Sequence, residues 1–143
     1  MRTASCLGLV GCVEMRDGCT GQSLWRSANE VLPSGQGLVM DFLRGRAVAG
    51  IKLLAIEDEV GEIWRCAPAN VADPSPTERV YEFYLTEDEP PDPPQLIKHL
   101  KLMADDATEV LDTGTVYAKV TADRQKKVNQ SLTILWTISV AKG

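Results

Sequence analysis

A single histidine and four cysteines are the residues of this sequence best suited to chemistry. His99 lies beside an apolar stripe, and nothing near it in the sequence marks a catalytic triad. No nucleophile motif surrounds Cys6, Cys12, Cys19 or Cys66. The sequence therefore predicts a chain without catalytic residues. A small thiol-dependent enzyme built on a Cys–His pair is the alternative that enzyme chemistry leaves open.

The same cysteines are poorly spaced for a metal site. Five residues separate Cys6 from Cys12 and six separate Cys12 from Cys19, whereas structural zinc is held by shorter C-x2–4-C knuckles. The stretch Leu9–Cys12 spells a lipoprotein cleavage box, but the apolar run before it is short and almost without basic residues. We therefore expect reduced thiols in a cytoplasmic compartment, with no metal and no cofactor.

Carboxylates gather in three short runs, at 57–59, 87–89 and 105–106. A catalytic acid needs burial to raise its pKa, and acidic runs of this kind are usually solvated. The ordered ligand spacing of a calcium loop and the glycine pattern of a phosphate-binding loop are both missing from the sequence. No small-molecule substrate is expected.

The charge balance excludes further classes of partner. The chain has 143 residues, of which 15 are Lys or Arg and 20 are Asp or Glu, so its net charge is −5. Nucleic-acid binders concentrate cations to neutralise phosphates, and the only basic run here is the short 124–127, which we expect in a solvated turn. No apolar run reaches the roughly 18–20 residues of a membrane-spanning helix. The sequence indicates one globular domain without nucleic-acid or membrane partners.

The last third of the sequence has the clearest periodicity. Residues 131–140 alternate as a strand, and the apolar residues on one face are Leu132, Ile134, Trp136, Ile138 and Val140. A helix over about 94–112 is predicted from Pro94 at its first turn, Gly114 beyond its end and one apolar stripe. That stripe is Leu96, Leu100, Met103, Ala107, Val110 and Leu111. A strand over 115–122 would pair with the last strand in a C-terminal β-hairpin.

Earlier elements are shorter. Leu24, Trp25, Ala28, Val31 and Leu32 lie at helical spacing after Ser23, so a short helix is predicted before the breaker 33–35. Segments 47–56 and 63–67 read as a hairpin, and 79–86 reads as a third strand. The fold class is α+β, with small antiparallel sheets packed against one main amphipathic helix.

Two segments stand apart from this domain. Residues 1–22 carry several glycines with poor alternation, which favours an extended N-terminal arm and leaves a core strand as the alternative. Residues 87–94 combine four carboxylates with four prolines, which is typical of a rigid, solvated connector.

Helix, glycine turn, strand, polar turn and alternating strand follow one another over Leu96–Leu111, Val116–Val120 and Leu132–Val140. This order resembles small phage-tail proteins, of the sheath-initiator kind in contractile-tail baseplates or of the tail-terminator kind. The resemblance implies a virion protein assembled in the host cytoplasm, whose terminal strand docks with neighbouring subunits. It brings no catalytic residues.

We therefore expect a non-enzymatic structural or assembly protein whose partners are other protein subunits. Strand pairing and apolar burial would hold the subunits together. The candidate interface residues lie in the N-terminal segment and in the last strand: Leu7, Leu9, Val10, Leu132, Ile134, Trp136 and Ile138. A cytoplasmic protein-binding or regulatory module is the alternative outside an assembly.

Overall fold

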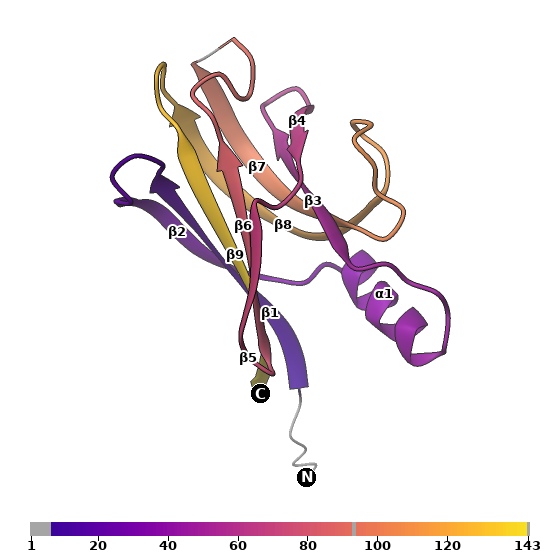
Figure 1. Ribbon diagram of the computed structural model, residues 1–143. Helices are drawn as coiled ribbons and strands as arrows, with labels where there is room; N and C mark the ends of the chain where they lie inside the picture. The colour runs from indigo at the N-terminus through magenta and orange to yellow at the C-terminus, as the bar shows by residue number, and fades with distance from the viewer. Residues whose placement is uncertain (1–6, 93, 143) are drawn as a thin grey trace.

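The computed structural model describes residues 7–92 and 94–142. Two antiparallel β-sheets lie face to face in it, and a short helix lies at one end (Figure 1). The strands of the first sheet are β1 (Leu7–Asp17), β2 (Ser23–Glu30), β5 (Asn70–Ser75), β6 (Glu78–Leu85) and β9 (Leu132–Lys142). Those of the second are β3 (Ile51–Glu57), β4 (Glu62–Cys66), β7 (Gln95–Ala104) and β8 (Thr115–Lys126), and the helix is α1 (Pro33–Leu43).

The strand orders are β2-β1-β9-β6-β5 and β4-β3-β7-β8. The last strand, β9, is therefore central, because it pairs antiparallel with β1 on one side and with β6 on the other. The alternation predicted for it is confirmed over most of the strand: Leu132, Ile134 and Trp136 are buried, and Ile138 packs against the same core. Val140, predicted on the same face, is 40% exposed. The hairpin predicted around the acidic turn at 57–61 is also confirmed as β3 and β4, and the third predicted strand is β6.

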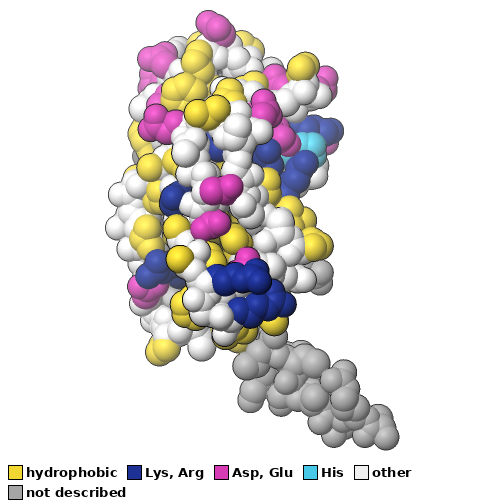
Figure 2. Space-filling view, turned by 90° about the vertical axis from the view of Figure 1, so that its right-hand side faces the viewer, with side chains coloured by type: hydrophobic (Ala, Val, Ile, Leu, Met, Phe, Trp, Pro, Cys, Tyr) yellow, Lys and Arg dark blue, Asp and Glu magenta, His cyan; other side chains and the backbone are white. Residues whose placement is uncertain are grey.

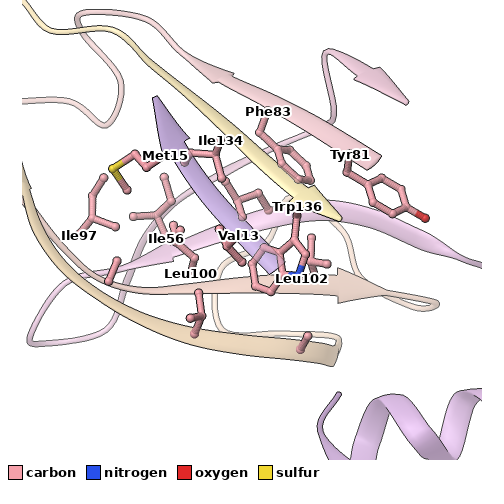
Figure 3. Close-up of a cluster of buried hydrophobic side chains, with 14 of the residues drawn as sticks. Val13, Met15, Ile56, Tyr81, Phe83, Ile97, Leu100, Leu102, Ile134 and Trp136 are labelled. Carbon is pink, nitrogen blue, oxygen red and sulfur yellow. The ribbon is translucent and has the colours of Figure 1, made fainter. Parts of the chain in front are cut away.

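One core fills the space between the sheets. Side chains from β1, β6 and β9 point toward side chains from β3 and β7 (Figure 3). Those labelled from the first sheet are Val13, Met15, Tyr81, Phe83, Ile134 and Trp136, and those from the second are Ile56, Ile97, Leu100 and Leu102. Burial of this apolar surface is the main stabilising contribution to such a sandwich.

The sandwich is closed along the edge formed by β2 and β8. After β2 the chain crosses to the second sheet, where Val31 bridges to Ala118 and the Leu32 N–H donates to the Tyr117 carbonyl at 3.1 Å. Pro33 then begins α1, since its fixed backbone angle and missing N–H suit a first helical turn. A Cβ on Gly35 would lie 2.3 Å from the Tyr117 carbonyl oxygen, so only glycine lets the helix approach β8 this closely.

The main helix predicted over 94–112 is wrong. Residues 95–104 form β7, and 105–114 form a loop without regular structure. A β-bulge between Ile97 and His99 shifts the alternation, and Leu102, Met103 and Ala104 are buried in succession because both faces of the strand are covered. An apolar run with such a shift matches helical spacing by accident.

The helix predicted over 23–32 is also wrong, because residues 23–30 form β2. Cross-strand pairing places Trp25 and Ser27 on the inner face, opposite Met15 and Val13. A polar residue on the inner face breaks the apolar alternation that would have indicated a strand. The helix of the described chain begins instead at Pro33, inside the segment expected to end one.

The C-terminal β-hairpin does not form. The strands over 115–126 and 132–142 follow one another in the sequence, but β8 lies in the second sheet and β9 in the first. The small antiparallel sheets of the α+β prediction are present, while the helical part is reduced to the 11 residues of α1. None of the helices described is long and apolar enough to cross a membrane.

The predicted N-terminal arm is a core strand over residues 7–17 and a turn over residues 18–22. Residues 7–17 form β1, which pairs with β2 on one edge and β9 on the other, and Val13 and Met15 are buried. The first six residues of that predicted arm lie outside the described residues. The acidic proline-rich segment 87–94 connects β6 with β7, and Pro90 within it is buried.

Candidate functional site

The interface residues expected from sequence are divided between the core and the surface. Leu132, Ile134 and Trp136 are buried inside the chain's own sandwich, so their side chains do not face a partner. Three further predicted interface residues lie in β1. Leu9 packs against the core, and Val10 lies opposite Ser139 on the outer face of the first sheet. The backbone of Leu7 pairs with that of Lys142. Ile138 alone among the predicted interface residues lines the pocket described next.

This pocket lies between α1 and the end of the sandwich where β3 begins and β9 nears its end. It has a volume of about 360 Å³ and is mostly apolar. We call it the α1 pocket, and its walls come from the helix, the loop before β3, and five strands. Its lining includes the apolar and aromatic side chains of Leu38, Phe42, Ile51, Tyr81, Tyr117 and Ile138.

Apolar side chains continue from the pocket onto the exposed surface of α1. Phe42 lines the pocket and is 68% exposed, while Met40 and Leu43 beside it on the helix are also exposed. Leu38 and Val39 face the sandwich and pack partly. The helix thus has apolar residues on two sides, which is more than its contact with β8 requires. Several large exposed apolar side chains on one short helix suit a site of interaction.

Polar groups stand at the edge of the α1 pocket. Arg79 donates two hydrogen bonds to Asp73, at 2.7 and 3.1 Å, and its guanidinium lies over the ring of Tyr81. Burial, with a smaller effect from Tyr81, raises the pKa of the Tyr117 phenol to about 12. Tyr117 therefore stays a neutral phenol across the physiological range and adds no charge to the pocket.

Two exposed arginines follow the end of α1, between Phe42 and the loop residues that line the pocket. Arg44 and Arg46 share one aspartate, Asp41, at 3.4 and 2.8 Å, and both guanidinium side chains are more than half exposed. Each guanidinium has five N–H donors, so most of them face solvent here. In the space-filling view, one group of Lys and Arg side chains lies in the lower part and a second lies beside the histidine in the upper part, where Asp and Glu side chains are also more frequent (Figure 2).

A second cluster of charged residues lies on the outer face of the second sheet. Glu62 and Arg65 form a two-point ion pair with side chains only 0% and 1% exposed. Arg65 also donates to the carbonyls of Thr108 and Thr113, at 2.7 and 2.6 Å, and Glu62 accepts the Asp112 N–H at 2.5 Å. The pair therefore fastens the 105–114 loop over the sheet, and its function is structural.

His99 belongs to the exposed edge of that cluster. Its Nδ1 lies 3.2 Å from Glu57, and the same carboxylate has Lys101 at 3.1 Å and Lys119 at 3.4 Å. Burial alone raises the pKa of Glu57, but Lys101 and Lys119 outweigh it and hold that pKa below its ordinary value. Glu57 is thus a carboxylate that neutralises two lysines, and His99 is paired with that carboxylate.

The described cysteines are dispersed. Cys12 accepts a contact from Arg26 at 3.3 Å on the outer face of the first sheet, and Cys19 is exposed. Burial, followed by the charge of Glu89, raises the pKa of Cys66 to about 12, so this thiol stays protonated at neutral pH. Cys6 lies outside the described residues. Over 7–92 and 94–142, no three His, Cys, Asp or Glu side chains gather as metal ligands would.

The basic run at 124–127 is not wholly a solvated turn. Residues 124–126 end β8, and Lys126 is buried with its Nζ donating to the Glu87 carbonyl at 3.0 Å. Burial lowers the pKa of Lys126, and the nearby charges of 87–89 oppose that effect. Lys126 therefore holds the start of the acidic connector through its hydrogen bond to the Glu87 carbonyl.

Sequence reasoning missed most of the α1 pocket. The apolar run at 37–43 was visible, but its role depends on a helix that begins at Pro33, and the other walls come from distant strands. The sequence signal for the helix is Pro33, which suits a first helical turn, followed by Ser34, Gly35 and then the run Leu38–Leu43. Comparison of the chain with protein-family models, with curated proteins and with solved structures finds no match.

Proposed function

We propose that this protein is a non-enzymatic structural subunit that contacts other protein chains in a larger assembly through its α1 end. The observation that carries the proposal is the α1 pocket together with the exposed apolar side chains of Met40, Phe42 and Leu43. Covering such a surface with another chain is favourable, because it stabilises the complex by roughly 25 cal/mol for each Å² of apolar area removed from water.

The chemistry of the chain favours this function over the thiol enzyme. Cys66 carries a raised pKa, which is the opposite of what an attacking thiolate needs. His99 is engaged with Glu57 in a network that neutralises lysines. The α1 pocket, by contrast, contains no Cys, Ser, Thr, Lys or His among its lining residues and is suited to apolar contact.

A phage tail or baseplate is the assembly that we propose. Two of the three segments behind that resemblance are strands, at 116–120 and 132–140, but they lie in different sheets, and β9 is already paired on both edges within the chain. The third, 96–111, is strand and loop in place of a helix and gives it no support. The proposed structural role is based on the α1 surface and does not depend on which kind of particle the chain belongs to.

The proposal is tested by fractionating the native source by particle size and following the chain by mass spectrometry. The wild-type chain should sediment with particles many times larger than its own 15.6 kDa, and negative-stain images should show tails or baseplates. Phe42→Glu should move the chain to the light fraction, because a charge on the helix would be buried against the partner.

Val110→Glu is the matched control, since Val110 is an exposed apolar residue in the 105–114 loop and away from the α1 pocket. That variant should remain in the heavy fraction. A wild-type chain found light, or in a complex with one or two other chains, would contradict the proposal and favour the regulatory module. So would a Phe42→Glu chain that sediments as the control does.

A further inference from the structure

The turn between β3 and β4 presents an apolar side chain at the end of the molecule opposite α1 (Figure 1). Val60 at its tip is 96% exposed, the largest exposure among the large hydrophobic residues of the described chain. Its neighbours Asp58 and Glu59 are acidic, and no Lys or Arg pairs with either of them among the described ion pairs. We call residues 58–61 the Val60 turn.

The Val60 turn is held rigid by its own hydrogen bonds. The Asp58 Oδ1 accepts the N–H groups of Val60 and Gly61, at 2.8 and 3.0 Å, and the Asp58 N–H donates to the Gly61 carbonyl at 3.0 Å. An aspartate bonded in this way fixes the turn without any partner. Val60 is therefore already ordered for binding, which lowers the entropic cost of inserting it into another surface.

The α1 pocket has the complementary properties. Its lining is apolar and its volume of about 360 Å³ admits a valine side chain with the adjoining turn backbone. Arg44 and Arg46 at the end of α1 present guanidinium donors to solvent, and their shared partner Asp41 accepts only a few of them. A carboxylate that accompanied an incoming valine would find charge-assisted donors there.

We infer that the partner at the α1 pocket is a second copy of this chain, whose Val60 turn inserts head-to-tail with Asp58 and Glu59 facing Arg44 and Arg46. This inference rests on the proposed function and names its partner. Ile51 at the start of β3 lines the pocket, whereas the turn follows the far end of that strand, on the opposite side of the molecule from α1 (Figure 1), so a chain cannot fill its own pocket. Each copy keeps a free turn and a free pocket, and such a contact extends into a filament or closes into a ring.

The test is sedimentation of the purified full-length chain over a range of concentrations. Wild type should associate beyond the dimer, and raising the salt from about 0.05 M to about 0.5 M should weaken the association because the attraction between the arginines and the acidic residues is screened. Val60→Asp and Phe42→Glu should each weaken it by more than about tenfold, since each buries a charge in apolar surroundings. Val110→Asp, an exposed valine in another acidic loop, should associate as wild type does.

Mixing the two variants makes the test specific. Val60→Asp keeps an intact α1 pocket and Phe42→Glu keeps an intact Val60 turn, so the mixture retains one working contact and should form dimers only. A wild-type chain that stays monomeric up to about 1 mM, a Val60→Asp chain that associates normally, or a mixture without dimers would overturn the inference. A monomeric purified chain whose native particle is still lost on Phe42→Glu would overturn this inference and leave the proposed function in place.

Discussion

Replacing Glu62 by alanine should lower the free energy of unfolding by about 3–5 kcal/mol, because it leaves the buried charge of Arg65 without its partner. The Arg65 side chain is 1% exposed and donates to Glu62 at two points. The change also removes the acceptor of the Asp112 N–H, so the 105–114 loop loses a fastening contact. Chemical denaturation measures the loss directly.

The same contact makes stability depend on pH. Burial alone raises the pKa of Glu62, but the hydrogen bonds from Arg65 and Asp112 and the charge of Lys101 outweigh it, so that pKa lies below its ordinary value of 4.5. A carboxyl whose pKa is lower in the folded chain stabilises it above the unfolded value, and this contribution is lost as the pH falls below about 4.5. Glu62→Gln should therefore flatten the acid limb of the stability curve.

Glu109→Gln is the control for both measurements, since Glu109 is exposed in the same loop. It should change the free energy of unfolding by less than about 0.5 kcal/mol. If Glu62→Ala costs no more than this control, the ion pair does not hold the loop.

Truncating Trp136 to alanine should cost about 3–5 kcal/mol, as expected for a large aromatic side chain removed from a packed core. Trp136 is 0% exposed and sits in the central strand β9, opposite Val13 on β1 and Tyr81 on β6. The cavity would lie between the two sheets, where neither can collapse without moving the other. Thermal or chemical unfolding measures the loss.

Thr137→Ala provides the comparison within the same strand. Thr137 points to the opposite face of β9, away from the core, and its truncation should cost about 1 kcal/mol or less. Equal losses at the two positions would mean that both faces of β9 are buried, contrary to the sandwich described.

The sequence was most informative where a strand has one buried face and one exposed face. In β9, apolar residues recur at alternate positions from Leu132 to Val140, and the structure confirms a buried face from Leu132 to Ile138, whereas Val140 is exposed. The hairpin of β3 and β4 could also be predicted, because an acidic turn separates two apolar runs. Neither pattern reveals which strands become neighbours, so the placement of β8 and β9 in different sheets was not predictable.

The predicted helices failed where strand geometry is irregular. A bulge at 97–99 and burial on both faces near Met103 hid the period of β7, and the inward-facing Ser27 hid that of β2. The 105–114 loop covers the outer face of β7 near Met103 and is held there by the distant residues Arg65 and Glu62. The spacing of residues within β7 therefore cannot predict that this face is buried.

The candidate site was even less accessible to sequence reasoning. Ile138 was the one predicted interface residue that lines the α1 pocket, since the pocket combines the helix with the ends of strands from both sheets. The alternation that predicts Leu132, Ile134 and Trp136 as interface residues identifies core residues equally well. An exposed surface such as that of Phe42 is distinguished from core only once the packing of α1 is known.

Amide hydrogen exchange tests the central claim, that the α1 end is covered by another protein chain. Exchange over α1 and the loop at 44–50 should be slower in the native assembly than in the dilute purified chain, because partner contacts exclude water from these amides. The 105–114 loop serves as an internal reference and should exchange equally in both. Equal exchange at 44–50 in the two samples would contradict the account.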